Sequence, residues 1–77
     1  MTIEQCAQVY AVKYVLDYNS FKKNEKLRRE LTEIHIRFNG NKEFDTLFEK
    51  YVADLRTKEE MPRWARLIMA ERYSINI

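Results

Sequence analysis

Apolar side chains recur at intervals of three and four residues in four segments of the chain, and this spacing predicts four helices. The clearest stripe belongs to the second segment, where the intervals are four, three and four: Leu27, Leu31, Ile34 and Phe38. We expect the helices near residues 2–18, 21–38, 42–57 and 62–73.

The first predicted helix is apolar on nearly all sides, and only a thin stripe of polar residues interrupts it. Such a helix is usually central in its domain or covered by a partner. We therefore expect it at the centre of the fold, opened by a capping box in which Thr2 and Gln5 bond to each other's backbone.

The segment Asn39-Gly40-Asn41 admits two interpretations. In one, Gly40 takes the left-handed position that ends a helix, and Asn41 caps the next. In the other, the alternation between Glu33 and Phe38 makes a strand, and Asn39-Gly40 turns a hairpin. The helical spacing from Phe44 onward favours the first. The fold class is therefore all-α, a single domain over 1–77, with an α+β fold carrying one short hairpin as the alternative.

Length and composition agree with one small helical core. The 77 residues include 45% hydrophobic types but only one glycine and one proline, which is too few turn formers for a sandwich or barrel. Pro62 suits the first turn of the last helix. The predicted core consists of Tyr14, Val15, Leu31, Ile34, Leu47, Phe48, Tyr51, Leu55, Trp64 and Ile68.

Catalytic or cofactor chemistry is not expected. The chain has one histidine, His35, and one cysteine, Cys6, and neither belongs to a spacing that makes a nucleophilic or metal site. We interpret Cys6 as a small buried hydrophobic residue. The lone thiol, and an N-terminal segment without a basic stretch before its apolar residues, predict a cytoplasmic protein. The missing catalytic and metal-ligand spacings predict that it has no enzymatic activity, metal or cofactor.

Charge is distributed by segment although the formal net charge is only +2. Residues 20–37 hold six basic and three acidic residues, and residues 42–60 hold four basic and six acidic ones. Two basic clusters face away from the predicted core and could follow a phosphate backbone. They comprise Lys22, Lys26, Arg28 and Arg29 on the second helix, and Arg63 and Arg66 on the fourth, with Tyr73 placed to stack on a base.

One short stretch carries a resemblance. Residues 45–50, read Asp-Thr-Leu-Phe-Glu-Lys, resemble a helix-opening segment of the Hha-type nucleoid modulators over those few positions. The resemblance implies a partner in nucleic-acid machinery and extends no further along the chain. Size and composition are also similar to those of small phage accessory proteins.

Two functions follow from these patterns. The first is a non-enzymatic accessory or regulatory protein of nucleic-acid metabolism, which binds phosphate weakly, without sequence preference, beside a protein partner of the DNA-processing machinery. The second is a protein-interaction adaptor that has no affinity for nucleic acid and does not contact a membrane. A homodimer is one form that such an adaptor could take. Its docking residues would be Ile36 and the first-helix tyrosines Tyr10, Tyr14 and Tyr18.

Overall fold

Four helices make up the described part of the chain, which in this computed structural model covers residues 1–15, 25–57 and 59–73. They are α1 (Ile3–Val15), α2 (Glu25–Phe38), α3 (Lys42–Thr57) and α4 (Arg63–Arg72). The all-α prediction is confirmed. The hairpin alternative is wrong, because no strand lies on either side of Gly40 in the described residues. The predicted helical positions 16–18 and 21–24 lie outside the described residues.

The helix ends form as the sequence predicts. The Thr2 amide donates to Gln5 Oε1 at 2.9 Å, and the Gln5 amide donates to Thr2 Oγ1 at 3.1 Å. Gly40 has a φ of +78°, the left-handed backbone that favours glycine. Asn41 Oδ1 accepts a hydrogen bond from the Phe44 amide at 3.0 Å and so caps the start of α3. The turn between α2 and α3 is therefore limited to residues 39–41.

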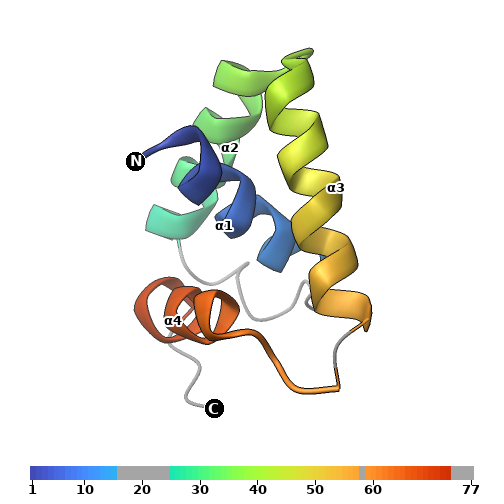
Figure 1. Cartoon of the computed structure of the whole chain (residues 1–77). Helices are drawn as coiled ribbons and strands as arrows, with labels where there is room; N and C mark the ends of the chain where they lie inside the picture. The colour runs from blue at the N-terminus through green and yellow to red at the C-terminus, as the bar shows by residue number, and fades with distance from the viewer. Residues whose placement is uncertain (16–24, 58, 74–77) are drawn as a thin grey trace.

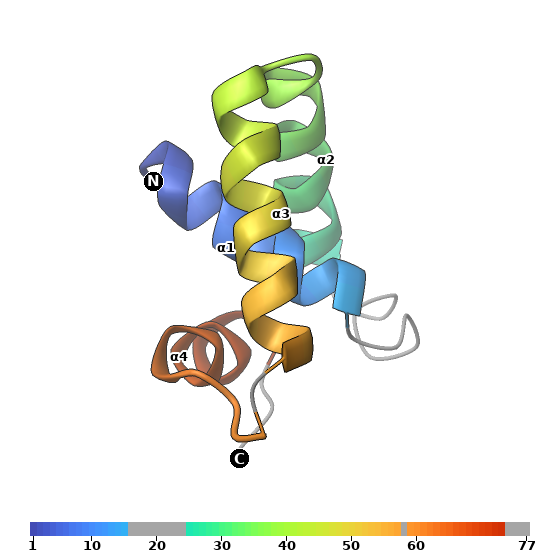
Figure 2. The same cartoon turned by 45° about the vertical axis from the view of Figure 1, so that its right-hand side comes forward.

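The central position predicted for the first helix is confirmed, since α1 contacts each of the other three helices. In Figures 1 and 2, α2 and α3 lead away from the turn at residues 39–41, and α4 lies below them, across the lower end of the molecule. Ala7 and Ala11 are fully buried on α1. Their small side chains let the neighbouring helices come close to this helix.

The core draws on all four helices and includes four of the predicted residues: Leu31, Ile34, Tyr51 and Ile68. Four others are only partly buried and pack against the core: Leu47, Phe48, Leu55 and Trp64. The interior contains several residues that were not singled out from the sequence, among them Val9, Val12 and Met69.

Tyr14 and Val15 were expected in the core, and this prediction is wrong. Their exposed fractions are 54% and 37%. Tyr14 lies seven residues after Ala7, on the same face of α1, and Ala7 is completely buried. The difference therefore comes from the position of Tyr14 near the end of the helix, where its large ring reaches past its neighbours.

Side chains of α3 and α4 join the last helix to the rest of the fold. The Trp64 indole Nε1–H donates to Asp54 Oδ2 at 3.0 Å. Arg72 forms an ion pair with Glu30, which ties the end of α4 to α2. Together these contacts fix the orientation of α4 more closely than its apolar face alone would.

Candidate functional site

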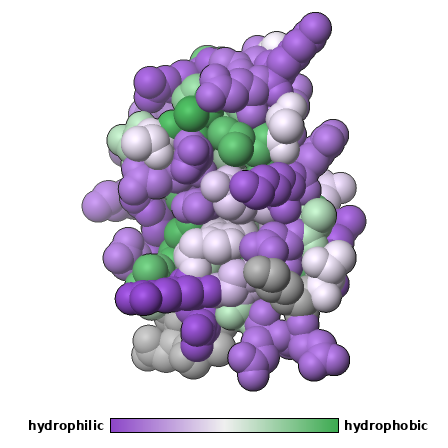
Figure 3. All heavy atoms as spheres, viewed as in Figure 1, coloured by the Kyte–Doolittle hydropathy of each residue, from purple (hydrophilic) through white to green (hydrophobic). Residues whose placement is uncertain are grey.

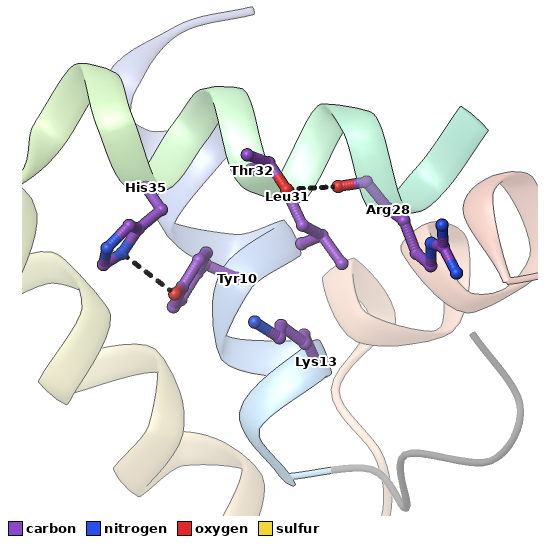
Figure 4. A pocket seen from close by; sticks show the side chains of 6 residues that line it. All are labelled: Tyr10, Lys13, Arg28, Leu31, Thr32 and His35. Carbon is purple, nitrogen blue, oxygen red and sulfur yellow. Dashed lines mark hydrogen bonds between the residues drawn. The ribbon is translucent and has the colours of Figure 1, made fainter. Parts of the chain in front are cut away.

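The described surface has a hollow between α1 and α2 that combines basic and aromatic side chains (Figure 4). We call it the α1–α2 groove. Its volume is about 390 Å³, within the range of small-ligand sites. The lining residues are Tyr10 and Lys13 of α1 with Arg28, Leu31, Thr32 and His35 of α2.

The α2 wall follows from helical spacing. Arg28, Thr32 and His35 are separated by four and three residues, so they share one flank of the helix, beside the buried stripe that includes Leu31. The Thr32 hydroxyl donates to the Arg28 carbonyl at 2.9 Å. This bond turns the Thr32 hydroxyl toward its own helix. Arg28 and His35 are therefore the side chains of this wall that extend outward from α2.

Aromatic contacts position the α1 wall. Tyr10 Oη and His35 Nδ1 lie 3.3 Å apart, and the two rings are nearly parallel at 16° with centroids 6.3 Å apart. Phe44 and Phe48 of α3 meet the Tyr10 ring edge-on. Tyr10 is thereby held from two sides, while Lys13 Nζ lies 4.8 Å from the centre of its ring. Figure 4 shows the Lys13 ammonium turned toward the Tyr10 ring, and the Arg28 side chain extending away from both.

The electrostatic character of the groove is positive. Two of its described lining side chains, Lys13 and Arg28, are basic, and none of the six is acidic. An anion in the groove would lie near the Lys13 ammonium and the Tyr10–His35 rings, with the Arg28 guanidinium farther along the same hollow. A phosphate next to a base or sugar carries this combination of charge and ring surface.

The outer side of α2 differs from the cationic surface predicted there. Lys26 and Arg29 share a shallow hollow with three glutamates: Glu25, Glu30 and Glu33. Arg29 Nη2 lies 3.1 Å from Glu25 Oε1, one helical turn earlier. The predicted cluster is therefore divided: Arg28 lines the α1–α2 groove, whereas Lys26 and Arg29 lie among carboxylates. Lys22 lies outside the described residues.

Tyr73 does not occupy the role predicted for it. Only 6% of its surface is exposed, and its hydroxyl donates to the Val9 carbonyl of α1 at 3.2 Å. Burial, and secondarily the negative charge of Glu30, raise the pKa of Tyr73 above its usual value, against an opposing effect of Arg72. The ring cannot stack on a base. Arg63 and Arg66, in contrast, are exposed on α4 as predicted.

The predicted partner-binding residues are not equivalent. Ile36 is 71% exposed and Tyr14 projects at the end of α1, but Tyr10 is half-buried in the groove wall. Tyr18 lies outside the described residues. Leu67 of α4 is a further exposed apolar side chain. Figure 3 shows a largely hydrophilic face with an apolar area between the upper parts of α2 and α3 and another lower down, on the left of the view.

Sequence reasoning missed Lys13, Thr32 and His35 as members of one site. Arg28 and His35 could have been paired from their seven-residue spacing, which places them on one flank of α2. Lys13 could not have been added, since the sequence does not specify which side of α1 faces α2.

Residues 1–15, 25–57 and 59–73 hold no candidate metal cluster. Cys6 is buried, as predicted, and no group of three potential metal ligands comes together in this part of the chain. None of the described helices is both long and apolar enough to cross a membrane. No family model, curated protein or solved structure matches the chain.

Proposed function

We propose that this chain is a non-enzymatic accessory protein of nucleic-acid metabolism that contacts the phosphate backbone through the α1–α2 groove. The observation that carries the proposal is a groove whose described lining residues include the basic Lys13 and Arg28 and the stacked Tyr10–His35 rings, and of which none is acidic. The buried free thiol of Cys6 agrees with work in a reducing cytoplasm.

Two cations set the expected strength. Binding that neutralises two phosphates of duplex DNA should weaken about 12-fold between 50 and 200 mM salt, given a slope of about −0.9 per phosphate. Exposed Arg63 and Arg66 would steepen this dependence if the strand extends over α4. Affinity in the range of about 10⁻⁴–10⁻⁶ M is typical of such sequence-independent contacts. A protein partner in the DNA-processing machinery would then be needed to hold the chain at its place of action.

The test is fluorescence anisotropy with single- and double-stranded oligonucleotides at these two salt concentrations. Lys13→Glu/Arg28→Glu reverses two charges in the groove, and Lys26→Glu/Arg29→Glu makes the same change of net charge on the outer side of α2. We expect the groove variant to lose at least 10-fold in affinity and the matched control to lose only a few-fold. Circular dichroism checks that both variants keep their helicity.

Two results would overturn the proposal. If the parent shows no binding at low salt, the groove is not a nucleic-acid site. If both double variants weaken binding equally, only the overall charge matters and the groove has no special role.

A second candidate function is a protein-interaction adaptor without affinity for nucleic acid. The exposure of Ile36 favours this function, because covering a large aliphatic side chain with a partner removes apolar surface from water and so favours binding. A lack of nucleic-acid binding, together with binding of a hydrophobic dye that Ile36→Ser diminishes, would support this function.

A further inference from the structure

The second feature of interest is a shallow hollow on the outer side of α3, at the end of α1. Its volume is about 520 Å³. We call it the α3 face. Its lining residues are Tyr14 of α1 and Phe48, Glu49, Val52, Ala53, Arg56 and Thr57 of α3.

The aromatic rim of the α3 face is open. Tyr14 is more than half exposed and meets Phe48 edge-on, with ring centroids 5.4 Å apart. The Arg56 guanidinium lies over the other side of the rim, 5.4 Å from the centre of the Tyr14 ring. Aromatic residues and arginine are enriched at protein interfaces, and here they share one edge of a helix.

Charge along the α3 face is self-complementary. Glu49 and Arg56 are seven residues apart, so they lie on the same face about 10.5 Å apart along the helix axis. Glu49 has no hydrogen-bond or ion-pair partner within residues 1–15, 25–57 and 59–73. Val52 and Ala53 lie midway between the two charges. A two-fold axis through this midpoint would set each Glu49 opposite the Arg56 of a second copy.

We infer that the α3 face binds a second copy of this chain, with the two α3 helices antiparallel and two reciprocal Glu49–Arg56 ion pairs. Ala53 at the centre is small and exposed, which permits an interaxial distance near the lower end of about 8–10 Å. Each Tyr14 ring would be covered by the opposite copy. Such a contact is isologous, so it closes at two copies and does not propagate.

The dimer should be weak. One helix pair with two flanking rings is at the small end of specific interfaces, which corresponds to dissociation constants in the micromolar range. This inference does not depend on nucleic-acid binding, because the α1–α2 groove has a different set of lining residues.

Sedimentation equilibrium over about 5–500 µM chain at low salt tests the inference. The parent mass should rise from 9.4 kDa toward twice that value. Glu49→Arg alone places two like-charged pairs in the dimer, and Arg56→Glu alone does the same with the opposite sign, so each should remain monomeric. Their equimolar mixture restores both ion pairs and should dimerise, as should the double variant Glu49→Arg/Arg56→Glu.

The matched control is Glu33→Arg, which makes the same charge change at an exposed site of α2 and should dimerise like the parent. A parent that stays monomeric throughout would overturn the inference, as would single variants that dimerise as the parent does. Failure of the mixture to dimerise would also overturn it, because complementary charge is the basis of the proposed pairing. Circular dichroism of each variant shows whether the fold is retained.

Discussion

Replacing Tyr73 with phenylalanine tests the way in which α4 is joined to α1. The substitution keeps the buried ring and removes only the hydroxyl that donates to the Val9 carbonyl at 3.2 Å. Val9 lies within α1, where its carbonyl can still accept the bond of the helix itself. The loss is therefore that of one neutral hydrogen bond, and Tyr73→Phe should be about 1 kcal/mol less stable than the parent at pH 8.

Alkaline pH should remove this difference. The pKa of Tyr73 is raised in the folded protein by burial, then by Glu30, from the usual 10.0. A raised pKa means that the stabilisation is complete below pH 10, where the unfolded phenol is also protonated. Above pH 10 the unfolded phenol ionises while the folded one does not, which removes up to about 1.4 kcal/mol of stability per pH unit. Tyr73→Phe escapes this loss, so the two proteins should be about equally stable near pH 11.

Urea unfolding followed by circular dichroism at pH 8 and pH 11 measures both effects. Tyr14→Phe is the control, since it removes a hydroxyl from an exposed ring and should change stability by less than about 0.5 kcal/mol at either pH. If Tyr73→Phe matches the parent at pH 8 and shows the same decline at pH 11, Tyr73 is not buried against Val9. The reasoning about α4 would then be refuted.

Two further substitutions test the core and the turn. Leu31 is 3% exposed, so Leu31→Ala should lower the free energy of unfolding by about 2–5 kcal/mol. The control Ile36→Ala changes an exposed residue and should alter the free energy of unfolding by less than about 0.5 kcal/mol. Urea unfolding measures both, and equal stabilities of the two variants would contradict the core assignment. Asn41→Ala removes the cap on the Phe44 amide and should cost about 1 kcal/mol, seen as a lower thermal midpoint with unchanged helix content.

The fold could be predicted from the sequence because its local signals agree with one another. The stripe that begins at Leu27 faces the core along the whole of α2, and Gly40 and Asn41 end one helix and begin the next as their chemistry requires. Such signals depend on residues within one or two helical turns. They hold wherever the helices finally pack.

Errors in the predicted core and site come from information that local patterns do not contain. Tyr14 shares a helix face with buried Ala7, but burial at the end of α1 depends on how far the neighbouring helices extend. Tyr73 follows a basic helix and therefore resembled a surface ligand residue. Its burial is decided by the placement of the end of α4 against Val9, which is a contact between residues 64 positions apart.

The distribution of charge shows why segment totals are a poor guide to a binding surface. Residues 20–37 carry a clear excess of base, yet Glu25, Glu30 and Glu33 accompany the basic residues of the outer side of α2. The groove side of α2 contributes one arginine, and only the approach of α1 adds Lys13 to it. An anion interacts with the charges of one face within about a Debye length, not with the average of a segment. The groove is therefore the stronger candidate for phosphate, although it holds fewer cations than the cluster that the sequence suggested.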